Sequence, residues 1–575
     1  MRGSFSPVSM PRNYYLSMNR GSAETFIRKY LVFAVACVSI VVAPRVILDP
    51  INAPKMLVLF IVSTVGAFLI FPHLGFYYKG KAKVLLIFAT IYLLDLLLIL
   101  FFADADFGQQ VYGTFGRNNG FLAYLGLMLV FLLGALTSNQ ASLKRFLLGL
   151  IFVSIVSGLY GILQSMKIDP AGFVSLYSPA IGFLGNPDFF SAFHGLALIA
   201  SVGLLIVLRE KNNLRFIYAF SAALNLYALK LAGAKQGALV AVIGVAMIIV
   251  VLAYQRSKKL GLSLASLGFI GAILVALGLY NVGPIASLIY KSSLEARGYY
   301  WGAAWNMSLE KPLFGVGLDN FGSWYRRTRS IEAYQWLPTQ ETNAAHNVFL
   351  DFSSNGGFPF LLLNLILAGM VLVSFISTLR KTEKLNPYYI IGFSIWVAFQ
   401  AQLLISINQI GNAVWGWALG GILLGYSYFA IEEPGSDKAE KVSKRRNVQK
   451  SDMLPASDLL RLTAGAILAI IIALPYWSSA VNFQGAIASQ SLEKIEQAAI
   501  QKPFDAVRML GSARVLKDNG KVDQARAILD LTVQAFPDSY GAWEEFSKLP
   551  GISEARMKEI KAELSRLDPR APGTP

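Results

Sequence analysis

The chain is poor in charged residues and in cysteine, and both shortages exclude classes of protein. Only 15% of its 575 residues are charged, whereas soluble domains carry about 25%. A soluble globular protein of this length is therefore excluded. The single cysteine, Cys37, lies inside an apolar run, which excludes an intrachain disulfide and cysteine-rich metal sites. With 55% hydrophobic residues, the composition predicts a polytopic membrane protein.

Apolar runs that are long enough, or nearly long enough, to cross a bilayer recur thirteen times along the chain. We therefore predict an all-α membrane protein with about 13 transmembrane helices. A second run closely follows the first, so we interpret the first as a membrane anchor and not as a cleaved signal peptide. The expected spans are residues 30–48, 55–71, 84–102, 120–137, 146–165, 189–208, 216–231, 237–254, 261–280, 357–379, 388–407, 412–430 and 461–478.

The distribution of positive charge predicts the orientation of the chain. A formal net charge of +17 would suggest nucleic acid in a soluble protein, but these cations lie in loops between apolar runs, so we expect no nucleic-acid partner. Every second loop is basic, which predicts a cytoplasmic N-terminal tail, residues 1–29, and a C-terminus outside. Residues 431–460 then form a cytoplasmic basic loop, whereas the loop 281–357 and residues 479–575 lie outside the cytoplasm.

The polar loop 281–357 is far longer than the other connections, and a long ordered loop usually carries function. It holds six cations and six acids, so any anion site in it must arise from local placement. Its many aromatic side chains suit either stacking on sugar rings or the aromatic belt of a membrane interface. Trp301, Trp305 and Leu309 have the spacing of one face of a helix lying on the membrane.

Residues 479–575 predict a soluble α-helical domain that resembles tetratricopeptide repeats. The similar segments 502–505 and 536–539 lie 34 residues apart, and the small or apolar residues between them suit a helix–turn–helix repeat. An ordinary helical hairpin is the alternative. The concave face of a repeat stack would suit an acceptor or a protein partner. The small or apolar positions are Ala513, Leu516, Gly520, Ala525 and Leu529.

Two glycine-rich segments, 113–120 and 182–188, each end an outer loop and open a predicted helix. Glycines allow tight turns there, and helix N-termini present unpaired N–H groups, so one interpretation is a phosphate-facing floor. The alternative is helix capping by Asn118 and Asn186. The sequence leaves both interpretations open.

Three cations, Arg117, Lys235 and Arg297, lie beside predicted membrane interfaces, where a charge is costly unless it is paired or hydrated. Each one alone is explained by snorkelling toward the head groups. Their shared position beside the long loop favours a common role with an anionic substrate.

His346 is the candidate proton acceptor among the three histidines, because it lies in a polar outer segment just before the tenth predicted span. A neutral histidine can accept a proton from a hydroxyl, although a capping or solvated histidine is the simpler interpretation of this residue alone. His194 lies within the sixth predicted span, where we expect a packing role. His73 lies in a basic inner loop and is given no role.

Together, these segments resemble the O-antigen ligase and polymerase family over roughly residues 100–430. That family includes lipid A-core ligases, repeat-unit polymerases and bacterial O-linked protein oligosaccharyltransferases. The two glycine-rich segments resemble its earlier outer motifs. The later motifs are Arg297 with Trp301 and Ala304, the segment Lys-Pro-Leu-Phe-Gly-Val-Gly at 311–317, Asn320-Phe321, and His346-Asn347 with Leu350 and Gly357.

The resemblance implies a glycosyltransferase of the bacterial cytoplasmic membrane. Such enzymes transfer a glycan from an undecaprenyl-diphosphate carrier to a hydroxyl of a lipid, a glycan or a protein, outside the cytoplasm and without a metal or other cofactor. It implies His346 as the base and Arg297 and Lys235 as ligands of the diphosphate, and Arg117 would assist them. The supporting residues would be Asn347, Trp301, Gly315, Gly317 and Asn186.

The chain departs from the family pattern at two positions. Lys235 stands where the family usually has arginine, so the charge is kept but the bidentate fork suited to phosphate is lost. Asn355 stands where the family often has glutamate, so a carboxylate role at that position is in doubt.

Two other functions stay open. Asp104 and Asp106 form a carboxylate pair in an outer loop, which could hold a divalent ion in a metal-dependent oligosaccharyltransferase. Enzymes of that type carry the pair after the first span, whereas here it follows the third. The many spans and the repeated segments also fit a glycolipid flippase or exporter without chemistry. No matching pair of interrupted, charged spans marks a transport site, however.

Overall fold

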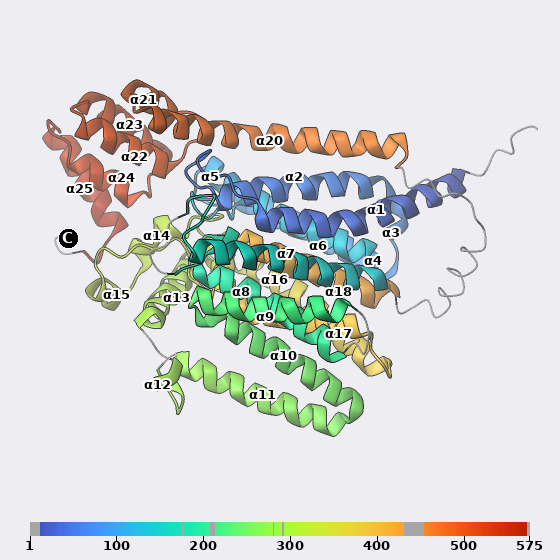
Figure 1. The fold of residues 1–575 in the computed structure, drawn as a ribbon. Helices are drawn as coiled ribbons and strands as arrows, with labels where there is room; N and C mark the ends of the chain where they lie inside the picture. Colours follow the sequence, from blue (N-terminus) through green and yellow to red (C-terminus); the bar gives the residue numbers. More distant parts are fainter. Residues whose placement is uncertain are drawn as a thin grey trace, which may run out of the picture.

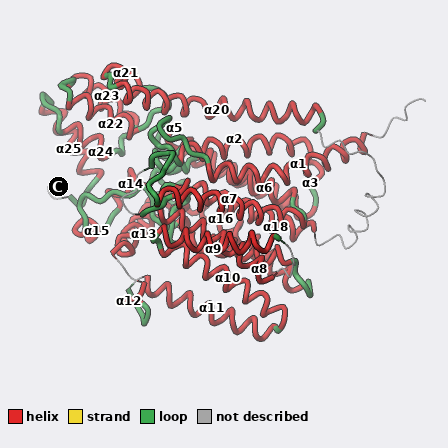
Figure 2. The backbone as a smooth tube through the Cα atoms, in the orientation of Figure 1, coloured by secondary structure: helices red, strands yellow, loops and turns green. Residues whose placement is uncertain are grey.

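The computed structural model describes residues 12–173, 178–207, 213–279, 281–289, 292–430 and 454–571. Within these ranges the chain forms helices and turns and no strand, as the red and green tube of Figure 2 shows. Eight of the described helices are long and apolar enough to cross a membrane. The structure therefore confirms the predicted class, an all-α polytopic membrane protein.

Each of the thirteen expected spans overlaps a helix, but eight of these helices meet both the length and the apolarity criterion, so the number of spans stays a prediction. The helices concerned are α1 (Arg12–Ile40), α2 (Asn52–Ile70), α4 (Gly80–Phe102), α6 (Phe121–Thr137), α7 (Gln140–Ser165), α8 (Pro187–Val207), α9 (Leu214–Ala232), α10 (Lys235–Arg256), α11 (Lys258–Leu279), α16 (Val348–Lys381), α17 (Pro387–Leu403), α18 (Ile410–Gly425) and α20 (Ala456–Ser489).

The first helix differs from its expected bounds at both ends. It already begins at Arg12, so the described part of the N-terminal tail is helical, and it ends at Ile40, before the expected end of the span. Lys55 of α2 explains the early end, because its Nζ donates to Ser39 O at 2.9 Å and to Val41 O at 2.7 Å. A buried ammonium group thus satisfies carbonyls that a longer helix would have used. The sequence analysis did not single out Lys55.

The helices form one bundle with two different ends (Figure 1). The end that we call the loop end carries α5 (Phe107–Tyr112), α12 (Ala286–Ile289), α13 (Ser292–Glu310), α14 (Phe321–Thr328), α15 (Ile331–Trp336) and the C-terminal helices. The opposite end carries α3 (Leu74–Tyr77) and the turn between α10 and α11, both within predicted basic loops. These predicted basic loops thus lie at one end of the bundle, and the predicted outer loop lies at the other. Which end faces the cytoplasm stays a prediction. The predicted basic loop 431–460 lies mostly outside the described residues.

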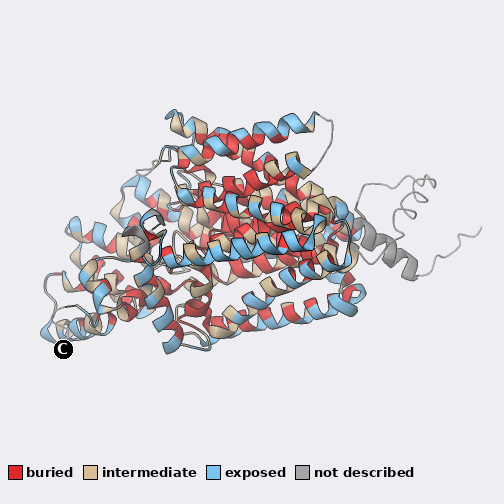
Figure 3. Ribbon diagram, turned by 90° about the horizontal axis from the view of Figure 1, so that it is seen from below, coloured by how far each residue is buried: buried red, intermediate tan, exposed pale blue. Residues whose placement is uncertain are grey.

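Close helix contacts at the centre of the bundle depend on small residues. A Cβ atom on Gly421 of α18 would lie 2.0 Å from Phe131 O of α6, and one on Gly425 would lie 2.1 Å from Ala135 O. Small residues at such contacts are typical of membrane helix pairs. Around this pair, α8 packs against α9, α10 and α17. Buried residues accordingly gather in the centre of the bundle (Figure 3).

His194 joins three helices of the bundle. Its Nδ1 lies 2.6 Å from Asn225 Oδ1 of α9, and its Nε2 lies 3.3 Å from Ser157 Oγ of α7. An amide oxygen only accepts, so Nδ1–H donates to Asn225 and Nε2 accepts from the serine hydroxyl. Both ring nitrogens are therefore used between packed helices, which confirms the predicted packing role of this histidine.

The C-terminal domain follows α20, which runs without a break past residue 479 to Ser489 and packs along α2. The expected domain boundary therefore lies inside a helix. Helices α22 and α23 form the predicted hairpin, and the three-residue connection 519–521 contains Gly520 at φ +77°. The repeat assignment stays a prediction. The domain consists of α21 (Leu492–Ala499), α22 (Ala506–Asp518), α23 (Val522–Ala535), α24 (Tyr540–Ser547) and α25 (Glu554–Leu567), and it buries Ala513, Leu516, Ala525 and Leu529.

Candidate active site

A cavity of about 480 Å³ lies between the loop end of the bundle and the C-terminal domain. Polar groups provide a substantial part of its lining, and His346 and Arg117 are among them. We call it the His346 cavity. Its walls come from residues 109–117, from Tyr300, from residues 322–326 and 340–346, and from residues 506–510 and 539–541 of the C-terminal domain. Segments far apart in the sequence therefore meet around one histidine.

Backbone geometry holds His346 at the start of α16. The residue has φ +56°, a left-handed conformation, and the next residue, Asn347, caps the helix by accepting from Phe349 N at 3.1 Å and Leu350 N at 3.3 Å. On the other side, Ala345 N donates to Asp351 Oδ1 at 2.7 Å. Asn347 therefore supports the histidine through the backbone, as a helix cap.

The imidazole of His346 is available for chemistry. Among the described residues, neither of its ring nitrogens has a protein hydrogen-bond partner, and the ring centre lies 5.8 Å from that of Tyr300. Burial, together with the positive charges of Arg297 and Arg117, lowers the pKa of His346 to about 3. The ring is consequently neutral at physiological pH, and one nitrogen can accept a proton.

Arg297 extends from α13 and is held at two points. Its Nη1 donates to Ile405 O, in the connection between α17 and α18, at 3.0 Å, and its Nη2 lies 3.9 Å from Asp188 Oδ2. Asp188 lies in the first turn of α8, whose start is capped by Asn186 through a 2.8 Å bond from Asp188 N. The long contact with Asp188 leaves much of the guanidinium charge available to an anion.

Arg117, which comes from the connection before α6, lines the His346 cavity, whereas Arg297 does not. Arg117 Nε donates to Asn343 Oδ1 at 2.7 Å, and burial lowers the pKa of this guanidinium while Asp319 opposes that effect. Asp319 Oδ2 accepts from Thr114 N at 2.7 Å and from Asn119 N at 3.0 Å. A protein carboxylate thus already binds the backbone N–H groups that a phosphate floor would use. The segment 113–120 contributes its arginine to the cavity, while those N–H groups stay with Asp319.

A comparison with known families bears on the function of this part of the chain. Residues 220–365, which contain Lys235, Arg297 and His346, match the family described as O-antigen ligase. The match supports the O-antigen ligase family for this segment. No curated protein matches the sequence at a significant level. The family indicates a glycosyltransferase-like enzyme that acts in surface polysaccharide synthesis and uses a lipid-linked glycan.

Lys235 of the ligase domain lies apart from the other two cations. It is the first residue of α10, its side chain is exposed, and the described residues provide it with no hydrogen bond or ion pair. Gly237 N donates to Ser191 Oγ at 3.2 Å, so the start of α10 lies beside the first turns of α8 and hence near the Arg297–Asp188 contact. Lys235 does not line the His346 cavity. It was predicted to hold the diphosphate together with Arg297, but no direct contact between the two side chains supports this.

The glycines of the ligase segment 311–317 have a structural role. Val316 N and Gly317 N donate to Ser354 O at 2.8 Å and Asn355 O at 3.1 Å, where α16 is broken at Gly357 with φ +77°. A Cβ on Gly315 would lie 2.3 Å from the backbone of Asn355. Segment 311–317 thus braces the helix that begins just after His346.

Asn355 has a role that its departure from the family pattern did not suggest. Its Oδ1 accepts from Asn320 N and Phe321 N, both at 3.0 Å, at the start of α14. An amide suffices for this task. Helix capping by Asn118 was one of the two interpretations left open for segment 113–120, but its Nδ2 instead donates to Tyr112 O and to Tyr476 Oη, and no side chain caps the start of α6.

Helix α13 of the ligase domain has one buried and one exposed face. Trp301 packs in part against the apolar cluster that contains Tyr300 and Ala304, whereas Trp305 and Leu309 are exposed. Trp301 therefore acts by packing, and the three residues do not share one environment. The position of α13 relative to a membrane stays a prediction.

The predicted carboxylate pair has a partly structural explanation. Asp106 Oδ1 accepts from Gln109 N at 2.7 Å and so caps α5. In the ranges that the structure describes, no group of three or more His, Cys, Asp or Glu side chains is placed to hold a metal ion.

The C-terminal domain is attached to the ligase loop by a buried carboxylate that sequence reasoning missed. Asp568 Oδ2 lies 2.6 Å from Arg329 Nη2 and 3.2 Å from Arg326 Nη1, and the side chains of Asp568 and Arg329 are 1% and 0% exposed. We call this group the Asp568 clasp. Arg326 also lies 4.2 Å from the ring centre of Tyr540 and pairs with Glu341. No local sequence signal links residues so far apart.

Proposed function

We propose that this protein transfers a glycan from an undecaprenyl-diphosphate carrier to an acceptor hydroxyl at the outer face of the bacterial cytoplasmic membrane. The observation that carries the proposal is a neutral, unpartnered His346 in a cavity beside Arg117 and near Arg297. The match to the O-antigen ligase family supports the same reaction class. The acceptor is a lipid, a growing glycan or a protein.

In the proposed step, His346 accepts the proton of the acceptor hydroxyl, and the hydroxyl oxygen attacks the sugar carbon that carries the diphosphate. The new carbon–oxygen bond forms as the bond to the diphosphate breaks, so the configuration at the sugar carbon inverts. The departing diphosphate takes the bonding electrons, and Arg297 and Arg117 stabilise its negative charge. Lys235, at the start of α10, binds the diphosphate from the rim of the site. The residues of this chain suffice for the step, which needs no metal.

The same cations couple donor binding to the strength of the base. In the empty site, their charges help to lower the pKa of His346. A bound diphosphate brings negative charge to the same place and offsets this effect, so the pKa of His346 rises toward its ordinary value. The base thus becomes stronger only when the donor is present, which limits wasteful reaction with water.

The test compares a deletion strain with purified protein. Lipid-linked glycan should accumulate at the outer leaflet of the deletion strain, whereas accumulation at the inner leaflet would identify a flippase. Proteoliposomes holding the donor and the cell's own acceptor glycoconjugate should form product in the presence of a chelator. Loss of transfer with chelator, and rescue by a divalent ion, would instead support the metal-dependent reaction at Asp104 and Asp106.

A further inference from the structure

A second cavity, of about 270 Å³, lies in the contact between the C-terminal domain and the bundle. Most of its lining surface is apolar, unlike that of the His346 cavity, and its polar lining residues are Asp49, Ser479, Asp505, Arg508 and Ser512. One wall is formed by Ile47 and Leu48, in the connection between α1 and α2, and by Ala53 at the start of α2. The other walls come from residues 476–487 of α20 and from residues 507–515 of the C-terminal domain. We call it the apolar cavity.

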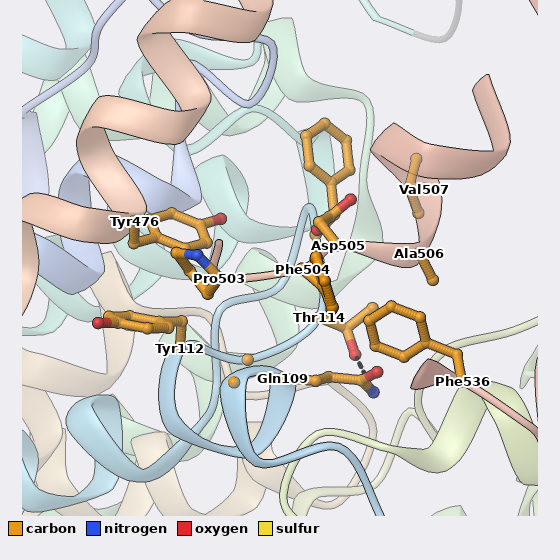
Figure 4. A pocket seen from close by; sticks show the side chains of 13 residues that line it. Gln109, Tyr112, Thr114, Tyr476, Pro503, Phe504, Asp505, Ala506, Val507 and Phe536 are labelled. Carbon is orange, nitrogen blue, oxygen red and sulfur yellow. Dashed lines mark hydrogen bonds between the residues drawn. The ribbon is translucent and has the colours of Figure 1, made fainter. Parts of the chain in front are cut away.

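The apolar cavity adjoins the candidate active site. Phe115 of the membrane part and Val507 of the C-terminal domain line both cavities, so these two side chains form the partition between them. The same pair lines a third, water-sized space of about 30 Å³, in which residues 503–507 lie beside Tyr112, Thr114 and Tyr476 (Figure 4). One continuous contact region therefore links His346 to an apolar space.

The edge of the apolar cavity is itself apolar and partly open. Leu48 is 42% exposed, Val507 is 51% exposed, and Ile487 and Val515 are similarly accessible. Exposed apolar groups that surround a hollow mark a ligand or a membrane contact more often than plain surface. Because Ala53 lies in the first turn of α2, a helix long and apolar enough to cross a membrane, we expect the cavity to lie at the level where the bundle leaves the membrane.

Two polar groups in the wall have no protein partner. In the part of the chain that the structure describes, Arg508 Nε and Ser512 Oγ make no hydrogen bond, although Arg508 is 6% and Ser512 1% exposed. Buried polar groups are normally satisfied, and leaving them without a partner is costly. Both residues line the apolar cavity. Arg508 Nη2 already donates to Gln501 O and Pro503 O, so we infer that Arg508 Nε and Ser512 Oγ are the groups left for the polar end of an apolar ligand.

We propose that the apolar cavity binds the hydrocarbon chain of a lipid-linked substrate whose polar end reaches Arg508, Ser512 and, past Phe115 and Val507, the His346 cavity. This inference rests on the proposed glycan transfer. A peptide would bring backbone N–H and C=O groups that this lining leaves without partners, whereas a hydrocarbon chain has none. The chain belongs either to the acceptor or to the polyprenyl carrier of the donor.

The test fills the cavity without disturbing the fold. A side chain added at Gly511, which lines the cavity, would start in open space, because a Cβ there meets no atom within 4 Å. Leucine also favours a helix more than glycine does, so Gly511→Leu should fold. Gly485→Leu in α20 is the matched control, since its Cβ is equally free and it lines neither cavity.

Two photoreactive probes distinguish the sources of the chain in phosphatidylcholine nanodiscs: a long-chain alkyl glycoside and a short polyprenyl phosphate, each with a diazirine at the chain end. We expect one of them to label residues 507–515 of the wild type and of Gly485→Leu. Labelling should fall roughly tenfold in Gly511→Leu, since the leucine displaces several buried chain carbons. The alkyl glycoside would indicate the acceptor, and the polyprenyl phosphate the donor.

Any of three results would overturn the assignment. These are equal labelling in the two leucine variants, no labelling by either probe, and displacement of the probe only by an apolar peptide. Glycan transfer by the wild type is measured in the same nanodiscs. If transfer is normal and the labelling result is negative, the lipid-chain site fails and the proposed function stands. A wild type that is labelled but transfers nothing overturns the proposed function, and with it the assignment of the chain to a substrate.

Discussion

His194 and His346 occupy two different regions of the same molecule, and their hydrogen bonds differ. In the bundle, both ring nitrogens of His194 have partners on neighbouring helices, at 2.6 and 3.3 Å. At the loop end, the described residues offer no hydrogen bond to the ring of His346, which lies in a cavity beside cations. A histidine with both nitrogens used holds helices together, whereas one with free nitrogens can exchange a proton.

The polar groups beside His194 contrast with two groups in the wall of the apolar cavity. Beside His194, Ser201 Oγ donates to Ser221 Oγ at 2.9 Å, and Asn225 Nδ2 donates to Ser221 O at 2.7 Å. In the wall of the apolar cavity, Arg508 Nε and Ser512 Oγ have no partner among the described residues. The groups beside His194 thus hold helices together, whereas the two in the cavity wall are those that we assign to a ligand.

The largest expected effect separates the two histidines. His346→Ala should lower kcat for glycan transfer by roughly 10²–10⁴, the contribution of a general base, with unchanged folding. His194→Ala should retain transfer per folded molecule but lower stability by about 1–3 kcal/mol, because Asn225 loses its buried partner. Transfer assays in proteoliposomes and thermal unfolding of both variants measure this difference. Normal transfer by intact His346→Ala protein would reject the base assignment.

The next effect concerns the leaving group. Arg297→Gln should lower kcat by about 10²–10³, because a charge that stabilises the departing diphosphate is lost. Lys235→Gln should act in the same direction but less, since Lys235 is exposed, whereas the Arg297 side chain is only 16% exposed and its charge helps to lower the pKa of His346.

Arg327→Gln is the matched control for Arg297→Gln, because this arginine pairs with Glu310 and, unlike Arg297, does not contribute to the lowered pKa of His346. Steady-state kinetics at varied donor concentration separate the variants. A larger loss in Lys235→Gln than in Arg297→Gln would reverse the assigned roles.

A smaller effect is expected when the C-terminal domain, which forms one wall of the His346 cavity, is held less firmly. Asp568→Asn leaves Arg329 buried without its counter-charge, a change that costs about 3–5 kcal/mol in buried ion pairs. The domain should then detach more often, which would raise the KM for the acceptor roughly tenfold and speed proteolysis after α20.

The matched control is Asp530→Asn, because that carboxylate pairs with Arg556 within the domain and is 41% exposed. Both measurements should stay near wild-type values in this variant. If the two aspartate variants have the same acceptor KM, the domain is not a wall of the site.

The smallest expected effect is a shift in pH dependence. Arg117→Gln removes a positive charge that disfavours the imidazolium, so the pKa of His346 should rise from about 3 toward its ordinary value. The acid limb of kcat/KM, which reports the free enzyme, should therefore move to higher pH, while Arg117→Lys should keep it in place. A shift to lower pH would contradict the electrostatic coupling between these residues.

Local patterns placed His346 just before a long helix, and they left the connections of the candidate site unpredicted. The Asn347 cap of that helix involves only neighbouring residues. The bond of Asn118 to Tyr476, 358 positions away, replaces the helix cap that was one open interpretation, and it could not be read locally. Lys55 also escaped notice, since a lysine in an apolar run predicts nothing until the carbonyls of another helix are placed beside it.

The sequence by itself determined the helical class, the loop that holds the candidate base and the family, because apolar periodicity and short motifs are local properties. Only the tertiary structure decided that Arg117 meets Asn343 across 226 positions and that the C-terminal domain covers the His346 cavity. It also decided that His194 uses both ring nitrogens between helices, whereas the ring of His346 has no hydrogen-bond partner among the described residues. The physical reason is that hydrogen-bond partners and electrostatic neighbours depend on how distant segments pack, which no local pattern encodes.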